Sequence, residues 1–352
     1  MATLELTGVE LSKDGRRILD GVDLSVANGE LVALVGASGS GKTTLLRVAA
    51  GLDVPDAGEV RLGGRLVEGD ISDRNVAMVF QNSVLYPLRD VARNVSFPLE
   101  MQHRSAAEIS ERVLAEGRAL HLTEMLDRNP RELSAGHQQL VQIARALVRA
   151  PDLFLMDEPL ARLDSRLRLE MRSELRMVQR GYGVTTLYVT NDPLEAMAVA
   201  DRLGVLVDGR LVQLGAPTDV YAEPVSRTVA ELTGDLDIVA AAVTSDDAGS
   251  WLEHDAFRIR AWAPALKPYA GIDVAVGFRP EHLALSDSGA RATVEAVSLH
   301  GPFELVKCRL GGDVVHVRSK HVAVGRGDVV WLDVVAGHVF DPVDGRTIAS
   351  WR

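Results

Sequence analysis

Hydrophobic positions change their period along the first part of the chain. Residues 1–30 alternate short apolar runs with turns, which predicts a small antiparallel sheet. Apolar residues recur at helical spacing between Leu140 and Leu147, so an amphipathic helix is expected there, ending near Pro151. Residues 85–130 show a helical but irregular pattern. The chain therefore begins with strands and continues into helical segments.

Apolar runs at residues 31–35 and 153–156 are typical of buried strands, the second ending in Asp157, and residues 185–190 (TTLYVT) predict a further strand. Residues 165–180 predict a further helix, with an apolar face that runs from Leu167 to Val178. Buried strands that alternate with helices predict a parallel α/β core.

The pattern changes near residue 235. From Ile238 onward helical periodicity disappears, and short alternating runs are broken by Gly, Asp and Pro. This predicts a second, all-β domain of the small-barrel type. We expect one domain at 1–234, with a helical subdomain at about 84–135, and a second at 235–352.

A glycine-rich stretch directly follows the apolar run at 31–35 and precedes a predicted helix. Its spacing is that of a phosphate-binding P-loop, in which backbone N–H groups and a helix N-terminus face an anion. Lys42 is expected near the β- and γ-phosphates, and the Thr43 hydroxyl near Mg²⁺. The predicted nucleotide-binding residues are Gly36, Ala37, Ser38, Gly39, Ser40, Gly41, Lys42, Thr43 and Thr44.

Acidic and amide side chains follow two other predicted strands. Asp157 ends the run at 153–157, where it can hold Mg²⁺, and Glu158 comes next as a candidate general base. Gln81 follows another strand and is placed to contact both Mg²⁺ and the attacking water. The alternative interpretation of Asp157 and Glu158 is an acidic turn after a strand.

Ser134 precedes the amphipathic helix. Its hydroxyl, the Gly136 backbone N–H and the helix dipole form a second candidate anion site. One nucleotide rarely needs two helix N-termini from a single subunit, so we expect this site to serve a nucleotide that another subunit holds. Alternatively, Ser134 only caps its helix; the two roles are compatible.

Composition excludes several classes of protein. With 49 acidic and 38 basic residues the net charge is −11, which argues against non-specific nucleic-acid binding. A single cysteine, Cys308, excludes an intramolecular disulfide and is expected to be a small buried residue. No apolar run reaches about 18 residues, and the N-terminus does not resemble a secretory signal, so a cytoplasmic location is expected.

In this order, the motifs resemble those of the ATP-binding subunit of an ABC transporter. They are the P-loop, the loop of Gln81, LSAGH, LFLMDEP, ARLD with Asp164, and YVTND. GFRPEHL, at residues 277–283, resembles a motif of the OB-like TOBE domain found in importer ATPases of the maltose and multiple-sugar type. The resemblance covers almost the whole chain. It implies a P-loop NTPase fold with a parallel sheet, an antiparallel β subdomain and a helical subdomain, followed by a small all-β OB-like regulatory domain.

The resemblance also implies cofactors and partners. ATP and Mg²⁺ would bind between the P-loop side of one subunit and the segment from Ser134 to His137 of another, in a homodimer or heterodimer of ATPase subunits. Two membrane-spanning permease subunits and an external solute-binding protein are the expected partners, with no nucleic acid. The chain would then lie on the inner face of the cell membrane. Its function would be ATP-driven solute uptake, with a carbohydrate as the favoured solute.

The sequence departs from the family pattern at three places. Asn191 stands where the family usually has a His that contacts the γ-phosphate, so we expect slow hydrolysis with Asn191 in that role. In the signature, Ala135 replaces a glycine and His137 replaces a Gln. Lys13 occupies the position of an aromatic residue that stacks on adenine, so it is a candidate nucleotide-binding residue that lays its stem or charge over the base. The alternative is that Lys13 is simply solvated.

These departures keep other functions open. The chain is either a transport ATPase, a weakly hydrolysing regulatory module, or the degenerate partner in a heterodimer. Polyamine and ferric-iron importers share the same layout. A soluble ABC ATPase of DNA repair or translation is disfavoured by the acidic charge and the TOBE-like tail.

Overall fold

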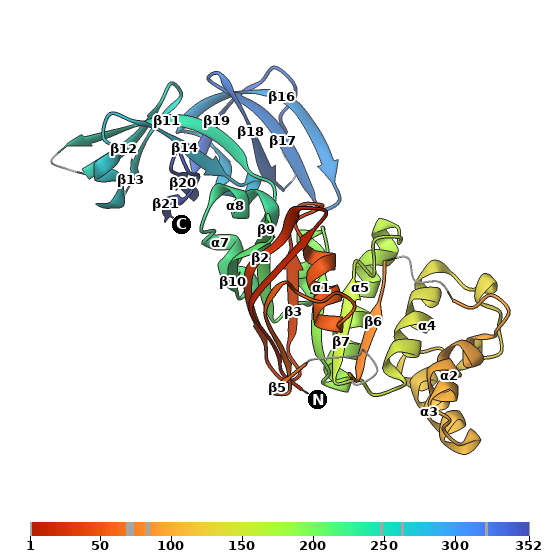
Figure 1. The fold of residues 1–352 in the computed structure, drawn as a ribbon. Helices are drawn as coiled ribbons and strands as arrows, with labels where there is room; N and C mark the ends of the chain where they lie inside the picture. Colours follow the sequence, from red (N-terminus) through yellow and green to blue (C-terminus); the bar gives the residue numbers. More distant parts are fainter. Residues whose placement is uncertain are drawn as a thin grey trace. The chain divides into compact units, whose positions relative to one another are not determined.

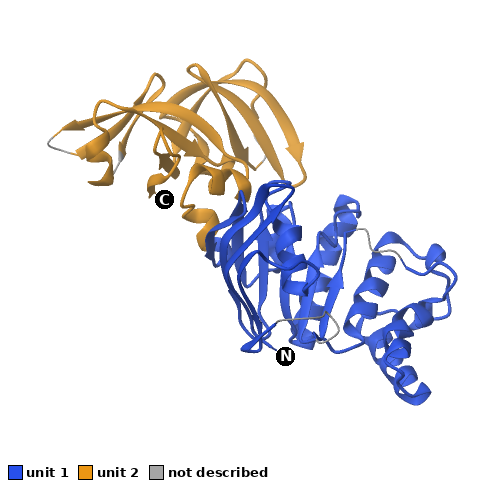
Figure 2. Ribbon diagram, in the orientation of Figure 1, with its two compact units in different colours: residues 1–218 blue, residues 219–352 orange. Residues whose placement is uncertain are grey.

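The computed structural model describes residues 2–67, 74–81, 85–246, 249–261, 264–320 and 323–351. It divides into two compact units, Met1–Thr218 and Asp219–Arg352 (Figure 2). The boundary predicted from the sequence lies later, after residue 234. The difference arises because the segment after residue 218 is hydrogen-bonded to the second unit: the backbone N–H of Thr347 donates to Val225 (3.1 Å).

An antiparallel sheet forms the beginning of the first unit, as the alternation in residues 1–30 predicts. Its strand order is β2-β1-β4-β5. The strands are β1 (Leu4–Lys13), β2 (Arg16–Val26), β4 (Ala57–Leu62) and β5 (Arg65–Leu66).

A central sheet with the order β10-β9-β3-β8-β7-β6 follows (Figure 1). Its strands are β3 (Leu31–Val35), β6 (Val76–Val79), β7 (Leu153–Asp157), β8 (Thr185–Val189), β9 (Arg202–Val207) and β10 (Arg210–Gly215). The five strands from β9 to β6 are parallel, and β10 pairs antiparallel with β9. The predicted parallel core is therefore confirmed, and the three strands predicted from residue 31, residue 153 and residue 185 are β3, β7 and β8, each buried along its whole length.

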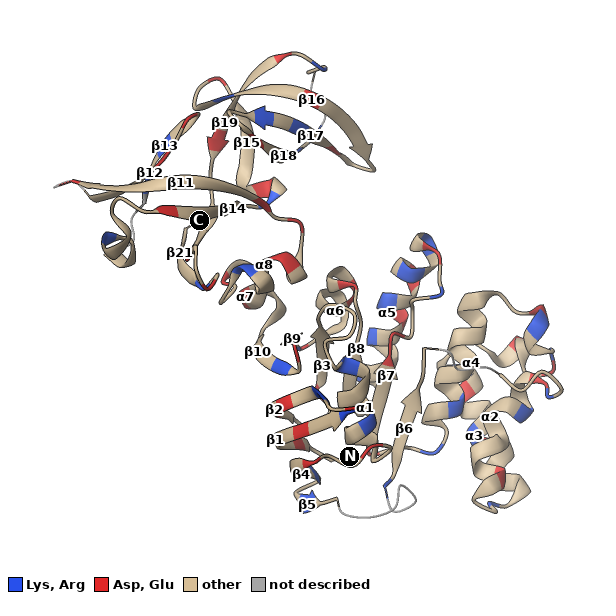
Figure 3. Ribbon diagram, turned by 45° about the horizontal axis from the view of Figure 1, so that its top comes forward, with Lys and Arg blue, Asp and Glu red and all other residues tan. Residues whose placement is uncertain are grey.

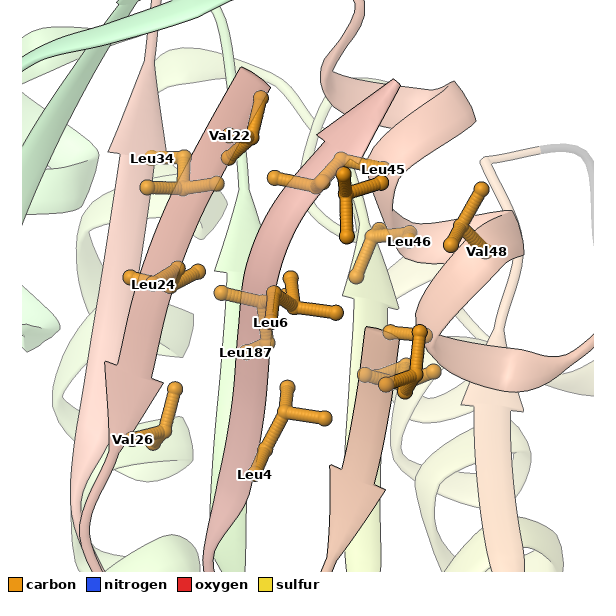
Figure 4. Packing of buried hydrophobic residues seen from close by; sticks show 14 of the residues in the cluster. Leu4, Leu6, Val22, Leu24, Val26, Leu34, Leu45, Leu46, Val48 and Leu187 are labelled. Atoms are coloured by element: carbon orange, nitrogen blue, oxygen red, sulfur yellow. The ribbon is translucent and has the colours of Figure 1, made fainter. Parts of the chain in front are cut away.

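Apolar side chains of the two sheets and of the first helix meet in one cluster. Leu6 of β1, Leu34 of β3, Leu187 of β8 and Leu45 of α1 (Lys42–Ala50) are fully or almost fully buried in it (Figure 4). The burial of this cluster fixes α1 between the sheets, so the loop before α1 has a rigid support on both sides.

The remaining helices of the first unit are α2 (Val91–Met101), α3 (Ala106–Ala119), α4 (Ala135–Leu147), α5 (Ser165–Tyr182) and α6 (Pro193–Val199), with short 3₁₀ helices at Thr123–Met125 and Pro130–Glu132. The amphipathic helix expected before Pro151 is α4. On α5, Met171, Leu175 and Val178 are buried as predicted, while Leu167 is half-buried. Val84, where the predicted helical subdomain starts, lies outside the described residues.

The second unit begins with α7 (Pro217–Ala222), which starts at the boundary, and α8 (Arg227–Thr233), and continues as two antiparallel sheets. One sheet has the order β13-β12-β11-β14-β20-β21, and the other β15-β19-β16-β17-β18. The strands are β11 (Asp237–Asp246), β12 (Gly249–His254), β13 (Phe257–Ala261), β14 (Asp273–Phe278), β15 (Leu283–Ser286), β16 (Ala290–His300), β17 (Phe303–Leu310), β18 (Asp313–Ser319), β19 (Val329–Val334), β20 (Gly337–Phe340) and β21 (Thr347–Trp351), with 3₁₀ helices at Pro264–Tyr269 and Pro280–His282.

Side chains from both of these sheets share one core, in which Cys308 is fully buried. Burial raises the pKa of the Cys308 thiol to about 11. The expectation of a small buried cysteine is confirmed.

Candidate functional site

The glycine-rich loop leaves β3 and turns directly into α1. A Cβ on Gly36 would lie 2.2 Å from the carbonyl oxygen of Leu206, so only glycine fits beside that backbone. Gly41, the N-cap of α1, has φ of 104°, a conformation that side chains with a Cβ rarely adopt. The sequence therefore places glycine where the turn into α1 requires it.

Lys42, the first residue of α1, is 5% exposed, and its ammonium group lies inside the loop. It donates to the carbonyl oxygens of Gly36 (2.8 Å) and Ala37 (2.9 Å). Burial lowers the pKa of Lys42, against the opposing charges of Glu158 and Asp157. An anion bound in the loop would restore the stability of the charged amine.

Thr43 and Asp157 supply two oxygen atoms side by side. The Thr43 hydroxyl donates to Asp157 Oδ1 at 3.1 Å, which joins the start of α1 to the end of β7. Asp157 is 5% exposed, and burial raises its pKa despite this hydrogen bond and the charge of Lys42. A buried carboxylate beside a hydroxyl suits a hard cation, whose charge would offset the cost of burial.

Glu158 adopts a backbone conformation that is rare for a residue with a side chain. Its φ is 45°, and its N–H donates to the carbonyl oxygen of Val189 at 2.9 Å. Gln81 Nε2 donates to one carboxylate oxygen at 2.9 Å, and Asn191 Nδ2 donates to the other. A carboxylate has about four lone-pair positions, so Glu158 keeps room to accept a proton from water.

An open pocket of about 420 Å³ lies over these groups. It is lined by Arg16, Ile18, Ser38, Gly39, Gly41, Lys42, Thr43, Thr44, Gln81, Glu158 and Asn191. The structure thus brings most of the predicted P-loop residues together with Gln81, Glu158 and Asn191. Arg16 and Ile18 were not predicted from the sequence, although their spacing of two on β2 places both on one face of the strand.

Lys13 does not line this pocket. Its ammonium group pairs with Asp53 at 2.6 Å, and the same carboxylate binds Arg47 of α1 at 2.9 Å. These charges hold the pKa of Asp53 at about 2, with the hydrogen bond from Arg47 as the largest cause. In this structure Lys13 is therefore engaged away from the pocket.

The signature residues also lie apart from the pocket within a single chain. Ser134 is the N-cap of α4: its hydroxyl accepts from the N–H of His137 (3.3 Å) and lies 2.8 Å from His137 Nδ1. Ala135 is exposed, and a Cβ on Gly136 would lie 2.9 Å from Leu167 of α5. Asp164 accepts from the N–H groups of Arg166 and Leu167 as the N-cap of α5.

Two family models match the chain. The ABC transporter model covers residues 19–161, and the TOBE domain model covers residues 276–340. The sn-glycerol-3-phosphate import ATP-binding protein UgpC of Paraburkholderia xenovorans is 40% identical over 98% of this chain and 99% of its own length. The protein of the same name from Chromohalobacter salexigens is 40% identical over 100% of this chain and 98% of its own length. The chain belongs to the ATP-binding subunits of ABC transporters. The predicted family, the importer ATPase function and the TOBE domain are thereby confirmed.

Solved structures resemble the ABC portion. CbiO1 from Clostridium perfringens, part of the ABC transporter complex cbiONQ, has a TM-score of 0.59 and 27% identity over 62% of this chain and 90% of its own. The ATP-binding cassette MJ0796 was solved as a dimer in a post-hydrolysis state bound to ADP and Pi. It has a TM-score of 0.53 and 31% identity over 61% of this chain and 98% of its own. Both support the P-loop fold, and the post-hydrolysis state of the second supports the ATPase activity of this family. In the described part of the chain, no helix combines the length and hydrophobicity that crossing a bilayer requires.

Proposed function

We propose that this ATPase hydrolyses ATP with Glu158 as the general base. The observation that carries the proposal is the position of its carboxylate, held by amides of Gln81 and Asn191 in the pocket that also contains Lys42. Glu158 would accept the proton of the attacking water, and Gln81 and Asn191 would orient that water. Lys42 would stabilise the charge that develops on the phosphates.

We propose that Mg²⁺ accompanies ATP and that Thr43, Asp157 and Gln81 hold it. The hydroxyl oxygen of Thr43, which lines the pocket, lies 3.1 Å from Asp157 Oδ1, a donor set that suits a hard cation. Bound Mg²⁺ would supply charge neutralisation of the phosphates. The described residues contain no cluster of three or more His, Cys, Asp or Glu suited to a metal, so phosphate and water oxygens would complete the coordination.

We propose that the second half of the site comes from another ATPase subunit. Ser134, Ala135, Gly136 and His137 lie at the N-terminus of a thirteen-residue helix and outside the pocket of their own chain, which supports a role toward a partner's nucleotide. Asp164 would lie in the same interface. Either a homodimer or a heterodimer satisfies this arrangement, and two permease subunits would hold it at the inner face of the membrane.

The transported solute is proposed from the relatives. Their names specify sn-glycerol-3-phosphate, so we propose a small polyol phosphate or a related carbohydrate that an external binding protein delivers. Uptake of labelled sn-glycerol-3-phosphate by cells that lack this gene, complemented with the unsubstituted chain or with Lys42→Ala, tests the solute. Equal uptake in both strains would contradict this assignment.

Hydrolysis is tested by Mg²⁺-dependent phosphate release from ATP by the purified chain. Lys42→Ala serves as the blank, because it removes the buried cation from the P-loop. We expect a rate clearly above this blank. ATP binding with a rate equal to the blank would favour the regulatory-module function and a heteromeric partner.

Asn191→His is expected to accelerate hydrolysis on the order of tenfold, because an imidazole reaches further than an amide and can carry charge toward the γ-phosphate. Steady-state kcat measures the effect. Asn191→Gln is the control, since it lengthens the side chain but keeps the amide. An unchanged kcat in Asn191→His would show that Asn191 does not limit the rate.

A further inference from the structure

Charged residues are frequent along α5 (Figure 3), and one of them joins two loops beside the site. One terminal nitrogen of Arg168 donates to the carbonyl oxygen of Leu163 at 3.1 Å. The other lies 3.4 Å from Asp192 Oδ2. Arg168 therefore links the loop before α5 to the residue that directly follows Asn191.

Arg172, one turn later on α5, offers an internal comparison. It pairs with the same Asp192 oxygen at 2.7 Å and is more buried than Arg168, with exposed fractions of 14% and 29%. Its hydrogen bonds within the described residues do not include the backbone of the loop before α5. The two arginines share one partner and differ in their contact with Leu163.

Hydrogen bonds hold both the backbone and the side chain of Asp192, so the position of Asp192 affects that of the neighbouring Asn191. The second oxygen of Asp192 accepts from the N–H of Glu195 at 3.1 Å as the N-cap of α6, and its N–H donates to the Thr190 hydroxyl at 3.1 Å. Asn191 lies between Thr190 and Asp192, and its amide donates to Glu158. A shift of Asp192 would therefore change the hydrogen bond from the Asn191 amide to the Glu158 carboxylate.

The loop before α5, which Arg168 contacts at Leu163, is held by hydrogen bonds within the loop. The N–H of Ala161 donates to Glu158 O at 3.2 Å, and that of Leu163 to Leu160 O at 3.1 Å. Asp164 then caps α5. The loop at residues 160–164 is thus connected to Glu158 in two ways. One connection is the backbone, and the other runs from Leu163 through Arg168 and Asp192 to Asn191, which donates to the Glu158 carboxylate.

We propose that Arg168 is a positioning residue: it holds Asn191 against Glu158 through Asp192 and makes that contact depend on the conformation of the loop at residues 160–164. The inference rests on the proposed role of Glu158 in hydrolysis. Because that loop carries Asp164, which we placed in the subunit interface, Arg168 would transmit the arrival of a partner subunit to the base.

The first test compares Arg168→Ala with Arg172→Ala in the full chain. Arg168→Ala is expected to lower kcat about tenfold, while the KM for ATP and the melting temperature stay close to those of Arg172→Ala. Arg172→Ala removes a contact with Asp192 but none with Leu163, so it should lower kcat by less than Arg168→Ala does. Arg168→Lys, with one compact donor instead of a fork, should recover only part of the rate. Equal effects of the two alanine variants would overturn the role of the Leu163 contact.

The second test is a double-mutant cycle with Asn191→Ala. If Arg168 acts through Asn191, Arg168→Ala should change kcat less than about twofold once the Asn191 amide is absent. Full additivity would overturn the proposal. Hydrolysis that Arg168→Ala leaves unchanged would contradict this role alone, whereas no hydrolysis by the unsubstituted chain would contradict the proposed function and this role with it.

Discussion

Glu158→Gln is expected to lower kcat by about 10²–10⁴-fold, the range by which general acid–base groups accelerate reactions. An amide of the same shape keeps an oxygen for one of the two donors, Gln81 or Asn191, but cannot take a proton from water. ATP affinity should change little, because Lys42 and the loop backbone are untouched. Single-turnover phosphate release and equilibrium ATP binding, measured on the same variant, separate these two effects.

Glu170→Gln is the matched control for this substitution. Glu170 lies on α5 with 61% of its side chain exposed and pairs only with Arg166 at 3.4 Å among the described residues. The same chemical change there should leave kcat within about twofold of the unsubstituted chain, since exposed pairs contribute little. If both variants hydrolyse ATP at full rate, another group must serve as the base.

Most residues of the candidate site could be predicted from the sequence because they follow strong local signals. Gly36 and Gly41 are required by the geometry of one tight turn, and Asp157 directly ends a continuous apolar strand. The parallel order of β3, β8 and β7 then brings their carboxyl ends to one edge. Local chemistry and sheet topology agree at this site.

Long-range contacts could not be predicted in the same way. Nothing near Lys13 in the sequence indicates that Asp53, 40 residues later, holds its amine. The link from Arg168 to Asp192 spans 24 residues and joins α5 to the start of α6, and only the structure shows that Arg168 also contacts Leu163. The periodic pattern predicts which elements form, but side-chain pairs between elements require their packing.

The position of the boundary between the two units could not be predicted from the sequence either, because it also depends on contacts between residues that are distant in the sequence. The sequence places the boundary near residue 235, because the short alternating runs of the second domain begin only there. The structure instead ties α8 to the second unit through Arg279, in the GFRPEHL motif, whose guanidinium donates to the Thr233 hydroxyl at 3.1 Å. This contact of a buried arginine joins the backbone hydrogen bond from Thr347 to Val225 in tying the segment to the second unit.

Arg279→Ala is expected to destabilise the second unit by about 3 kcal/mol, because it removes a buried charged group with several partners. Arg279 is fully buried; it donates to Tyr221 O at 3.0 Å and its guanidinium lies 3.7 Å from the centre of the Tyr221 ring. The Tyr221 hydroxyl in turn donates to Glu281. Loss of the arginine would leave a cavity and an unpaired carbonyl between α7 and the sheet.

Arg279→Met separates packing from charge. Burial lowers the pKa of Arg279, so part of what the guanidinium contributes is offset by the cost of taking its charge out of water. A methionine fills much of the same volume without that cost. We therefore expect Arg279→Met to lower the free energy of unfolding by roughly half as much as Arg279→Ala does. Calorimetric unfolding measures both variants, and hydrogen exchange in residues 219–234 shows whether α7 and α8 detach first.

The control is Arg291→Ala, since Arg291 is an exposed arginine on β16 of the same unit. It should change the unfolding free energy by less than about 0.5 kcal/mol. If Arg279→Ala is equally harmless, α7 and α8 must be held by other contacts, such as the buried side chains of Val220 and Val229 and the hydrogen bond from Arg227 N to Gly345 O at 2.8 Å. If it acts as expected, one arginine anchors the segment that leads from the ATPase unit into the TOBE unit, and that segment can be loosened without altering a residue of the nucleotide pocket.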